Sequence, residues 1–396
     1  MDFMNFSYKT AGESHGPELT AICEGLPAGL RLAAADIDSD LARRQLGFGR
    51  GGRMKIETDR AVILSGVRHG FTLGTPIAMR IANSDWKNWQ KVMDPEAPSG
   101  KGSEPLTVPR PGHADLAGAQ KFGLGDIRSV LERASARETA ARVSVGAVAR
   151  RLLDEFGIAV VSHVARIGPV KARRTARLSP EDFARVDESP VRCLDGQASA
   201  EMKRAISAAR RQGESLGGVF EVIAFGLIPG LGSYASGLER LGGRIGGALM
   251  SIPAIKGAEI GDGFALAARP GSTVHDELFF GLRKGFYRRT NHAGGLEGGI
   301  TNGEPLVARA VMKPIPTLTR PLRSADMATG QPSPALRERS DVCAVPAAAV
   351  VGEAMVAIEL ARALLEKFGG DCIGDTKEAV AAYLRRLRSS WPQPQS

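Results

Sequence analysis

The sequence contains few cysteines, and the four that it has stand far apart. Cys23, Cys193, Cys343 and Cys372 form no Cys-x-x-Cys pair, and no two histidines have the spacing of metal ligands. Zinc sites of the usual spacing depend on such pairs, and disulfide scaffolds depend on a much higher density of cysteines. The sequence therefore predicts neither a metal centre nor a disulfide framework.

Long apolar segments are also missing. No stretch reaches the ~18 consecutive apolar residues that a transmembrane helix needs. Met1–Asn5 carry no cluster of positive charge and no apolar run follows them, so a secretory signal peptide is not indicated. With 43% hydrophobic residues and no low-complexity tract, most of the chain is expected to fold. We therefore expect a cytoplasmic protein that makes no membrane contact.

Common nucleotide-binding and hydrolase motifs are absent as well. The Gly100-Lys101 pair is followed by Gly102 rather than Ser or Thr, so there is no Walker A loop. A loose match to the dinucleotide-binding pattern begins at Gly230, but Pro229 interrupts the turn and no acidic residue follows at the expected distance. No Gly-x-Ser-x-Gly nucleophile elbow occurs. These motifs therefore support none of the functions that they usually indicate.

Basic charge is abundant and comes mostly from arginine. There are 52 basic and 43 acidic residues, so the formal net charge is +9, and the basic residues comprise 39 Arg and 13 Lys. The planar guanidinium of Arg binds carboxylates and phosphates bidentately, whereas Lys acts as a point charge. Composition alone leaves three interpretations open: nucleic acid, an anionic metabolite, or a codon preference. The 48 Gly residues suggest tight turns or close approaches of backbone to a ligand.

Hydrophobic periodicity and turn residues predict interleaved helices and strands. We expect helices at 35–45, 137–156, 238–251 and 347–367, a further helix that opens at Ser179, strands at 19–23, 61–64, 158–164 and 219–228, and a loop at 94–105. No internal repeat and no clean linker is visible. The sequence therefore predicts one α+β domain with long central helices over residues 1–388, followed by a flexible tail over 389–396.

Two histidines stand in short segments that contain Gly and Pro. His15 lies in Gly12–Pro17, and His113 lies in Arg110–Asp115. Histidine titrates near neutral pH, and adjacent glycines allow the backbone to approach a ligand closely, so these segments indicate general acid chemistry. A histidine in a surface turn is the alternative interpretation of the first segment taken alone.

Residues 43–53 contain four Arg interspersed with four Gly and one aromatic residue. Backbone N–H groups and converging guanidinium groups in such a segment can form a cradle for phosphate or carboxylate. Runs of Arg and Gly also bind RNA without sequence preference. Against that alternative, this run is single and short and lies between regular elements.

Residues 132–139 place Arg and Ser where a predicted helix begins. Free backbone N–H groups and the helix dipole favour a phosphate there. Ser135 with Glu138 three residues later also forms a capping box, and the two interpretations are compatible. Three more clusters of Gly, Pro, His or Arg follow, at 291–303, 313–317 and 337–343.

Taken together and in this order, the seven clusters resemble the chorismate synthase family. The resemblance extends from about Ser7 to Gly370 and includes Gly-Glu-Ser-His-Gly, Arg-Pro-Gly-His-Ala-Asp, Arg-Ala-Ser-Ala-Arg-Glu-Thr, Asn-His-Ala-Gly-Gly and Arg-Ser-Asp-Val-Cys-Ala-Val-Pro. It implies a carbon–oxygen lyase that converts 5-enolpyruvylshikimate 3-phosphate to chorismate by anti-1,4-elimination of phosphate. This reaction is the last common step of the shikimate pathway to aromatic amino acids. The resemblance also implies reduced FMN, although the reaction has no net redox change.

The resemblance further implies a fold and an assembly. The family's fold is a β-α-β sandwich, in which two antiparallel sheets enclose a layer of long helices, and residues 347–367 would lie in that layer. The family assembles as a homotetramer. The implied partner is the small-molecule substrate, and neither nucleic acid nor a membrane is expected to bind.

Residue roles are implied by motif position. His15 would protonate the leaving phosphate or lie near it, His113 would hydrogen-bond or protonate the flavin at N1 and C2=O, and Asp341 would assist proton transfer at N5. The substrate carries one phosphate and two carboxylates, so it needs several Arg in a small volume. The implied substrate-binding residues are Ser14, Arg44, Arg50, Arg53, Arg110 and Arg137.

Flavin contacts are implied in the same way. They are Arg133, Ala134, Ser135, Pro253, Ala254, Gly298, Lys313, Pro314, Ile315, Pro316, Thr317 and Arg339. Other members often have Asn where this chain has Pro253, and proline has no N–H to donate. Arg44 and Arg50 also match positions that the family links to NADPH. The sequence leaves open whether the protein reduces its own flavin with NADPH or depends on a separate flavin reductase.

Overall fold

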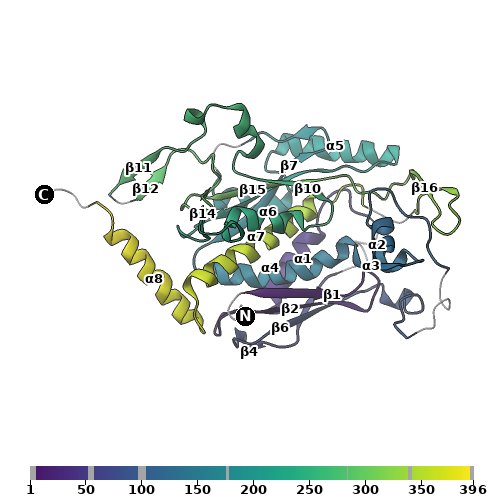
Figure 1. The fold of residues 1–396 in the computed structure, drawn as a ribbon, viewed down its shortest axis with the longest axis horizontal. Helices are drawn as coiled ribbons and strands as arrows, with labels where there is room; N and C mark the ends of the chain where they lie inside the picture. The colour runs from purple at the N-terminus through teal and green to yellow at the C-terminus, as the bar shows by residue number, and fades with distance from the viewer. Residues whose placement is uncertain are drawn as a thin grey trace.

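Two antiparallel sheets dominate the computed structural model of the protein (Figure 1). The structure describes residues 6–51, 58–96, 104–174, 178–282, 284–337 and 341–392. Across these ranges the chain combines helices and strands, so the predicted α+β class is confirmed. In the same ranges, no helix has the length and apolar character needed to cross a membrane, and no cluster of His, Cys, Asp and Glu could hold a metal ion.

The first sheet is formed near the N-terminus, with strand order β1-β2-β6-β3. Along β2, Leu19, Ala21 and Cys23 are buried while Ile22 is exposed. This period of two is typical of an antiparallel sheet that packs on the core with one face. The strands are β1 (Ser7–Ala11), β2 (Glu18–Glu24), β3 (Ala61–Ile63) and β6 (Ile77–Ala82), which confirms the strands predicted at 19–23 and 61–64.

The second sheet has the order β10-β15-β9-β7-β8, and all of its pairings are antiparallel. Its strands are β7 (Ala159–Ile167), β8 (Val170–Lys171), β9 (Gly218–Phe225), β10 (Ile255–Ile260) and β15 (Leu306–Met312). Strands were predicted at 158–164 and 219–228, and both exist. The second ends earlier than predicted, because Gly226 adopts a left-handed conformation with φ of 73°.

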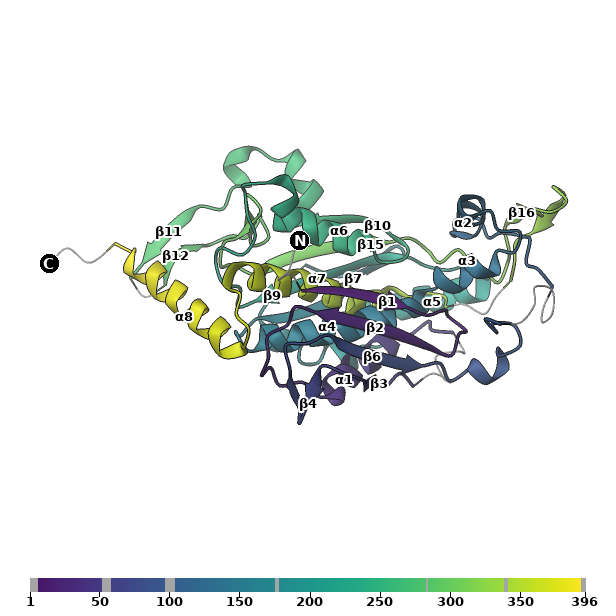
Figure 2. The ribbon, with the colours of Figure 1, turned by 60° about the horizontal axis from the view of Figure 1, so that its bottom comes forward.

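Three helices pack against one another and against the two sheets (Figures 1 and 2). They are α1 (Ala34–Gln45), α4 (Thr139–Asp154) and α7 (Val345–Phe368). Helix α4 contacts β1, β2 and β6, helix α7 contacts β7 and β9, and α4 packs on α7. Because α7 is buried on nearly every side, it is apolar on nearly every side. The helices predicted at 35–45, 137–156 and 347–367 are confirmed.

Helices α4 and α7 approach each other closely at Gly146 and Ala354. A Cβ atom built on Gly146 would lie 2.2 Å from the Cβ of Ala354 and 2.5 Å from its Cα. Atoms at that distance overlap, so only glycine allows the two helices this separation.

Two predicted helices are shorter than expected. The segment that opens at Ser179 forms two 3₁₀ turns, Pro180–Phe183 and Val186–Glu188, instead of a helix, and each turn buries one apolar side chain, Phe183 and Val186. The helix predicted at 238–251 begins at Leu241 (α6, Leu241–Met250), after a 3₁₀ turn at Gly237–Glu239.

Four helices are present that the sequence analysis missed. They are α2 (Asp115–Phe122), α3 (Arg128–Arg133), α5 (Gly196–Gln212) and α8 (Ile373–Ser389). Helix α8 reaches the first residue of the predicted tail, and residues 393–396 of that tail lie outside the described residues. Most of the predicted loop at 94–105, residues 97–103, lies outside them too.

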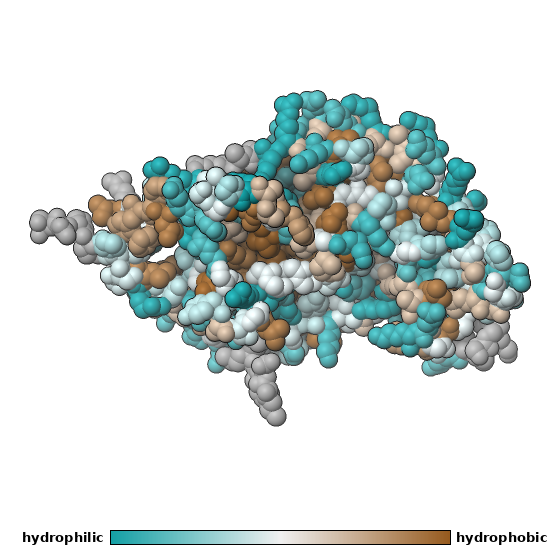
Figure 3. Space-filling view, turned by 45° about the horizontal axis from the view of Figure 1, so that its top comes forward, coloured by the Kyte–Doolittle hydropathy of each residue, from teal (hydrophilic) through white to brown (hydrophobic). Residues whose placement is uncertain are grey.

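Short hairpins complete the fold. The pairs are β4 (Val67–Arg68) with β5 (Phe71–Thr72), β11 (Leu278–Gly281) with β12 (Gly285–Arg288), β13 (Leu296–Glu297) with β14 (Ile300–Thr301), and β16 (Arg323–Ala325) with β17 (Pro332–Pro334). The β11–β12 hairpin projects from the body near the C-terminal end of α8 (Figures 1 and 2). Hydrophobic surface gathers at this end of the molecule (Figure 3).

Candidate functional site

His15 lies in the turn after β1, where Glu132 of α3 holds it. The Nδ1 atom of His15 is 2.8 Å from Oε1 of Glu132, and the His15 backbone N–H donates to Oε2 of the same carboxylate at 2.8 Å. The N–H of Ser14 donates to the carbonyl of Glu132 at 3.1 Å. Because Glu132 is 1% exposed, this contact fixes the ring from a rigid, buried position.

Two side chains that the sequence analysis missed pack beside His15. The ring of Trp89 stacks on the imidazole with centroids 3.8 Å apart, and the guanidinium of Arg128 lies 5.2 Å from the centroid of the Trp89 ring. Arg128 also lies 3.5 Å from Glu132. Trp89 is far from every motif in sequence, so no local signal could have placed it here.

His113 belongs to a second, tightly bonded group. Its Nδ1 lies 2.5 Å from Oδ1 of Asp115, and Arg110 donates to Oδ2 of Asp115 at 2.8 Å and to the hydroxyl of Thr317 at 3.0 Å. Burial alone would raise the pKa of Asp115, but the hydrogen bonds from His113 and Arg110 outweigh it and hold the pKa well below its ordinary value. Asp115 is therefore an ionised, fully buried orienting group for His113.

Arg44 and Arg137 meet at Asp59, a buried carboxylate that carries no predicted role. Arg137 is 2.5 Å from Asp59, and Arg44 is 3.5 Å from it. Arg44 also donates to Thr139 at 3.0 Å, and Arg137 donates to the side-chain oxygen of Asn83 at 2.8 Å. Both guanidinium groups are thereby held rigidly where the N-terminal sheet meets the start of α4.

The environment of Arg44 is strongly positive. Burial and the nearby charges of Arg50 and Arg137 outweigh the opposing charges of Asp59 and Asp341, and together these effects lower the pKa of Arg44 to about 10. Three buried or half-buried guanidinium groups near one another form a strong anion-binding field. The structure therefore brings together three of the predicted substrate-binding residues.

Asp341 bonds to the Arg- and Gly-rich segment at residues 43–53. Its Oδ2 lies 2.9 Å from Arg50, and the N–H of Gly51 donates to Oδ1 at 2.6 Å. The N–H of Val342 donates to the carbonyl of Gly49 at 2.7 Å, which ties the two segments together. Arg53 and Arg339, which the sequence analysis also assigned to the site, lie outside the described residues.

The implied flavin-binding segments form a chain of contacts beside these groups. Arg133 donates to the carbonyls of Thr10 and Gly12, and Ser135 caps the turn that begins the next helix by accepting from Arg137 N–H. Next to it, Arg142 joins Glu138 to Ser251, at the end of α6. Ala134 lies between Arg133 and Ser135, at the end of α3.

Ala254 and the segment Lys313–Thr317 continue that chain toward His113. Ala254 adopts φ of 67°, a left-handed conformation that is strained for a residue with a side chain. Its carbonyl accepts from the N–H of Lys313 at 3.0 Å, and the Lys313 ammonium donates to the carbonyl of Gly112. Ile315 accepts from the Ser215 hydroxyl at 2.6 Å, Pro314 and Pro316 stiffen the segment, and Thr317 contacts Arg110. Pro253 is half-buried in the preceding turn.

Gly298 is the exception among the predicted flavin contacts. It lies in the β13–β14 turn, where the neighbouring Gly299 accepts a hydrogen bond from Leu241 at the start of α6, whereas Ala254 follows the end of α6. A ten-residue helix is about 15 Å long. Within the chain, Gly298 is thus separated from the Ala254 segment by the length of that helix.

Comparisons with known proteins agree over nearly the whole chain. The family model described as chorismate synthase matches residues 6–365. A chorismate synthase of Desulforudis audaxviator is 57% identical over 383 residues, which cover 97% of this chain and 98% of that protein. One from Moorella thermoacetica is 58% identical over 381 residues, covering 96% and 99%. A chorismate synthase crystal structure matches with a TM-score of 0.79 and 43% identity, over 97% of this chain and 99% of its own.

Proposed function

Because the chain belongs to the chorismate synthase family, whose members are carbon–oxygen lyases, we propose that it converts 5-enolpyruvylshikimate 3-phosphate to chorismate by anti-1,4-elimination of phosphate. The observation that carries the proposal for this chain is the grouping of Arg44, Arg50 and Arg137 around buried carboxylates. A substrate with one phosphate and two carboxylates needs such a field. The product feeds the synthesis of aromatic amino acids.

The proposed substrate-binding residues are those of the motifs. We assign the phosphate and carboxylates to Ser14, Arg44, Arg50, Arg53, Arg110 and Arg137. His15 donates a proton to the departing phosphate, and the buried Glu132 keeps its ring in the orientation for doing so. The field of the Arg residues stabilises the negative charge that develops on phosphate as the C–O bond breaks.

The cofactor that we propose is reduced FMN, which supplies an electron transiently to the allylic system. The residues present fit it: the strained Ala254 bonds to the rigid Lys313–Thr317 segment, which reaches the His113 segment through Gly112 and Arg110, and the Arg133–Ser135 turn supplies further backbone groups. His113, oriented by Asp115, holds a proton at flavin N1 and C2=O. Asp341 holds or moves a proton at N5. Pro253 contributes shape and its carbonyl only.

Assembly, arrangement and location follow from the same family membership. We propose that the two sheets enclose α1, α4 and α7 as a β-α-β sandwich, supported by the contacts of α4 with one sheet and α7 with the other. We further propose a homotetramer that acts in the cytoplasm. We keep Gly298 among the proposed flavin-binding residues, although it lies near the start of α6 and Ala254 follows the end of that helix.

Anaerobic turnover tests the function. The purified protein is mixed with 5-enolpyruvylshikimate 3-phosphate and FMN reduced by dithionite, and both phosphate release and chorismate absorbance are followed. We expect equal amounts of both products with reduced FMN and neither with oxidised FMN. Full activity without any flavin, or no chorismate with reduced FMN, would refute the proposal.

The source of reducing equivalents is tested separately. Arg44 and Arg50 match positions that the family links to NADPH, and both serve the substrate equally well, so turnover with NADPH and oxidised FMN tests whether they are assigned to NADPH. Chorismate formed with NADPH as the only reductant shows that the protein reduces its own flavin. If product appears only after a flavin reductase is added, the NADPH assignment is wrong while the lyase assignment stands.

A further inference from the structure

A buried ionic cluster lies where the last turn of α1 packs near α7, and Glu353 is its centre. Glu353 stands in the middle of α7 and is 1% exposed. Its carboxylate accepts two hydrogen bonds from Arg43, at 2.7 and 2.8 Å, and others from Arg150 at 3.1 Å, Arg192 at 3.0 Å and the Ser162 hydroxyl at 2.6 Å. Helices α1 and α4, strand β7 and the segment that carries Arg192 therefore each contribute a donor to one carboxylate.

The cluster is electrically balanced. Its other two carboxylates belong to Asp40, which pairs with Arg43 and Arg150 at 2.9 Å, and Asp187, which pairs with Arg43 at 2.8 Å and with Arg192. Three carboxylates thus face three guanidinium groups. Well-packed apolar side chains often stabilise a core as much as such a network does. What the ion pairs add is a fixed geometry, because each guanidinium group is held in one orientation by its carboxylates.

Two connections run from the cluster to the anion site. Arg43 and Arg44 are adjacent in the last turn of α1, and Arg44 extends the other way, to Thr139 and Asp59. Fixing Arg43 on Glu353 therefore fixes the rotation of this turn and with it the direction of Arg44.

The second connection passes through residues 187–192. Asp187 and Arg192, at the two ends of this segment, are both bound to the cluster, and the carbonyl of Pro190 between them accepts from the N–H of Phe48 at 2.6 Å. Phe48 belongs to residues 46–51, the loop that carries Arg50 and bonds to Asp341 through Gly51. The cluster thus holds both Arg44 and the loop that presents Arg50.

We propose that Glu353 is a positioning residue for the anion site, which aligns Arg44 and the 46–51 loop through Arg43 and residues 187–192. The inference rests on the proposed function in that the aligned groups bind the anionic substrate. Loss of Glu353 would misplace two guanidinium groups that bind substrate. Asp341 bonds to the same loop through Arg50 and Gly51, whereas none of the contacts described for His15 or His113 reaches Arg44 or that loop. Its signature is a rise in KM that exceeds the fall in kcat.

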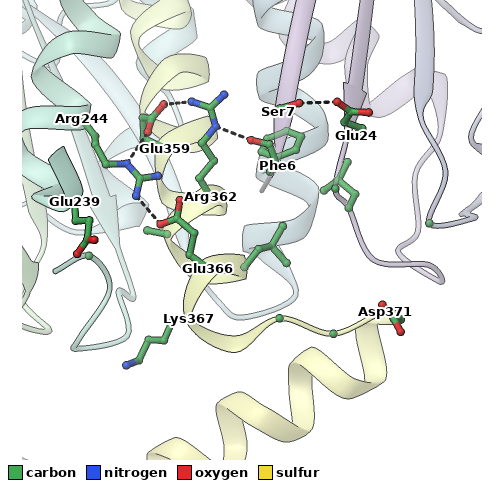
Figure 4. Close-up of a pocket in the computed structure, with 18 of the residues that line it drawn as sticks. Phe6, Ser7, Glu24, Glu239, Arg244, Glu359, Arg362, Glu366, Lys367 and Asp371 are labelled. Atoms are coloured by element: carbon green, nitrogen blue, oxygen red, sulfur yellow. Dashed lines mark hydrogen bonds and ion pairs between the residues drawn. The ribbon is translucent and has the colours of Figure 1, made fainter. Parts of the chain in front are cut away.

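Helix α7 offers a matched control in Glu359. This residue is also a buried carboxylate, 6% exposed, and it is bound by two guanidinium groups, Arg244 at 3.1 Å and Arg362 at 2.5 Å. Its neighbours, however, line a cavity of about 1840 Å³ at the end of the molecule formed by Phe6, the C-terminal turns of α7 and Asp371 (Figure 4). None of the contacts described for Glu359 reaches α1 or the 46–51 loop.

The experiment compares Glu353→Gln with Glu359→Gln under anaerobic turnover with reduced FMN. We expect Glu353→Gln to raise KM for 5-enolpyruvylshikimate 3-phosphate by about 10- to 100-fold, the usual effect of a displacement near 1 Å, with kcat within about threefold. Glu359→Gln should leave both constants within about twofold. Hydrogen exchange at Phe48 and Gly51 should accelerate in Glu353→Gln only. Equal kinetic constants and equal exchange in the two variants would overturn the proposal.

A double variant keeps the test decisive if Glu353→Gln folds poorly. Arg43→Gln with Glu353→Gln leaves two carboxylates facing two guanidinium groups, so it restores the charge balance. If Glu353 acts through Arg43, the double variant raises KM no further than Arg43→Gln alone does. Multiplying effects would show independent roles and contradict the proposal. A wild-type protein that makes no chorismate would refute the proposed function instead, and the exchange measurement would still report on the loop.

Discussion

His15 depends on Glu132 and Trp89 for its orientation, because the one bonds its Nδ1 and the other stacks on its ring. We expect Glu132→Gln to lower kcat by about 10- to 100-fold, and His15→Ala to lower it further, toward the ~10⁴-fold limit of a general acid. Glu18→Gln, at the start of β2, where the side chain is half-buried and pairs with Arg80 at 3.2 Å, is the control and should have no effect on kcat. A Glu132→Gln enzyme with wild-type kcat would show that the carboxylate does not orient His15.

The four cysteine thiols differ in burial, and their reactivity should differ with it. Burial raises the pKa of Cys23 and Cys343 to about 12 and that of Cys193 to about 11, so these thiols stay protonated near neutral pH. Cys372 is half-buried at the start of α8. With Ellman's reagent at pH 8, we expect one thiol per native chain to react rapidly, and none in Cys372→Ser. A rapid phase that survives this substitution would contradict the burial argument.

At the scale of residues, the motifs predicted which side chains belong to the candidate site, but they did not predict the distant residues that contact those side chains. His113, Asp115 and Arg110 are close in the chain, so their grouping could be predicted from one motif. Asp59 and Trp89 could not, because each meets its partner only after the chain has folded across dozens of residues. Long-range pairs of this kind leave no periodicity or spacing to detect.

Replacement of a helical glycine by alanine is expected to change the free energy of unfolding in opposite directions at two positions. Gly146→Ala places a methyl group against Ala354 of α7 and should destabilise the protein by about 1–3 kcal/mol, the cost of overpacking a core. Gly247→Ala in α6 meets no atom within 4 Å, so it should stabilise by up to about 1 kcal/mol through helix propensity. Urea unfolding measures both. The same sign of change for the two variants would contradict the packing argument.

Acid stability should depend on the carboxylate at the centre of α7. Burial raises the pKa of Glu353, but the charges of Arg43, Arg192 and Arg150 outweigh it and lower the pKa to about 2, from an ordinary 4.5. A depressed pKa in the folded state stabilises the protein above pH 4.5, and this contribution is lost as the pH falls toward 2. Glu353→Gln should therefore cost about 3–5 kcal/mol near pH 7 and progressively less below pH 4.5. A difference in unfolding free energy that is constant from pH 7 to pH 3 would contradict this assignment.

Among the elements, long apolar helices could be predicted and amphipathic ones were missed. Helix α7 is largely apolar along its 24 residues, and this long apolar segment could be predicted from the sequence. Helices α5 and α8 bury only one narrow face, at positions such as Ile206 and Val380, and the rest of their surface is polar. Local signals were nonetheless present in α5: Asp195 caps its N-terminus, Gly213 ends it in a left-handed conformation, and its buried residues recur every three to four positions.

At the scale of the molecule, the excess of arginine has an explanation that composition could not give. Arg44, Arg137 and Arg192 are buried, and each is bound to a carboxylate in the core rather than displayed to a polyanion. A protein that binds nucleic acid presents its cations on an open face. Arg44 and Arg137 thus converge on Asp59 and Arg192 binds Glu353, so these members of the arginine excess form ion pairs inside the protein.

The projecting β11–β12 hairpin indicates where copies of the chain meet in the proposed tetramer. Leu278 and Phe286 are 62% and 59% exposed, and Phe286 lies opposite Phe280, whose ring contacts Trp391. Apolar side chains gathered on a projecting element are typical of a subunit interface. We expect sedimentation velocity to give four times 41.8 kDa for the wild type and a smaller species for Phe286→Asp. Phe122→Asp, on α2 and 69% exposed, is the control and should stay tetrameric. A folded Phe286→Asp tetramer would place the interface elsewhere.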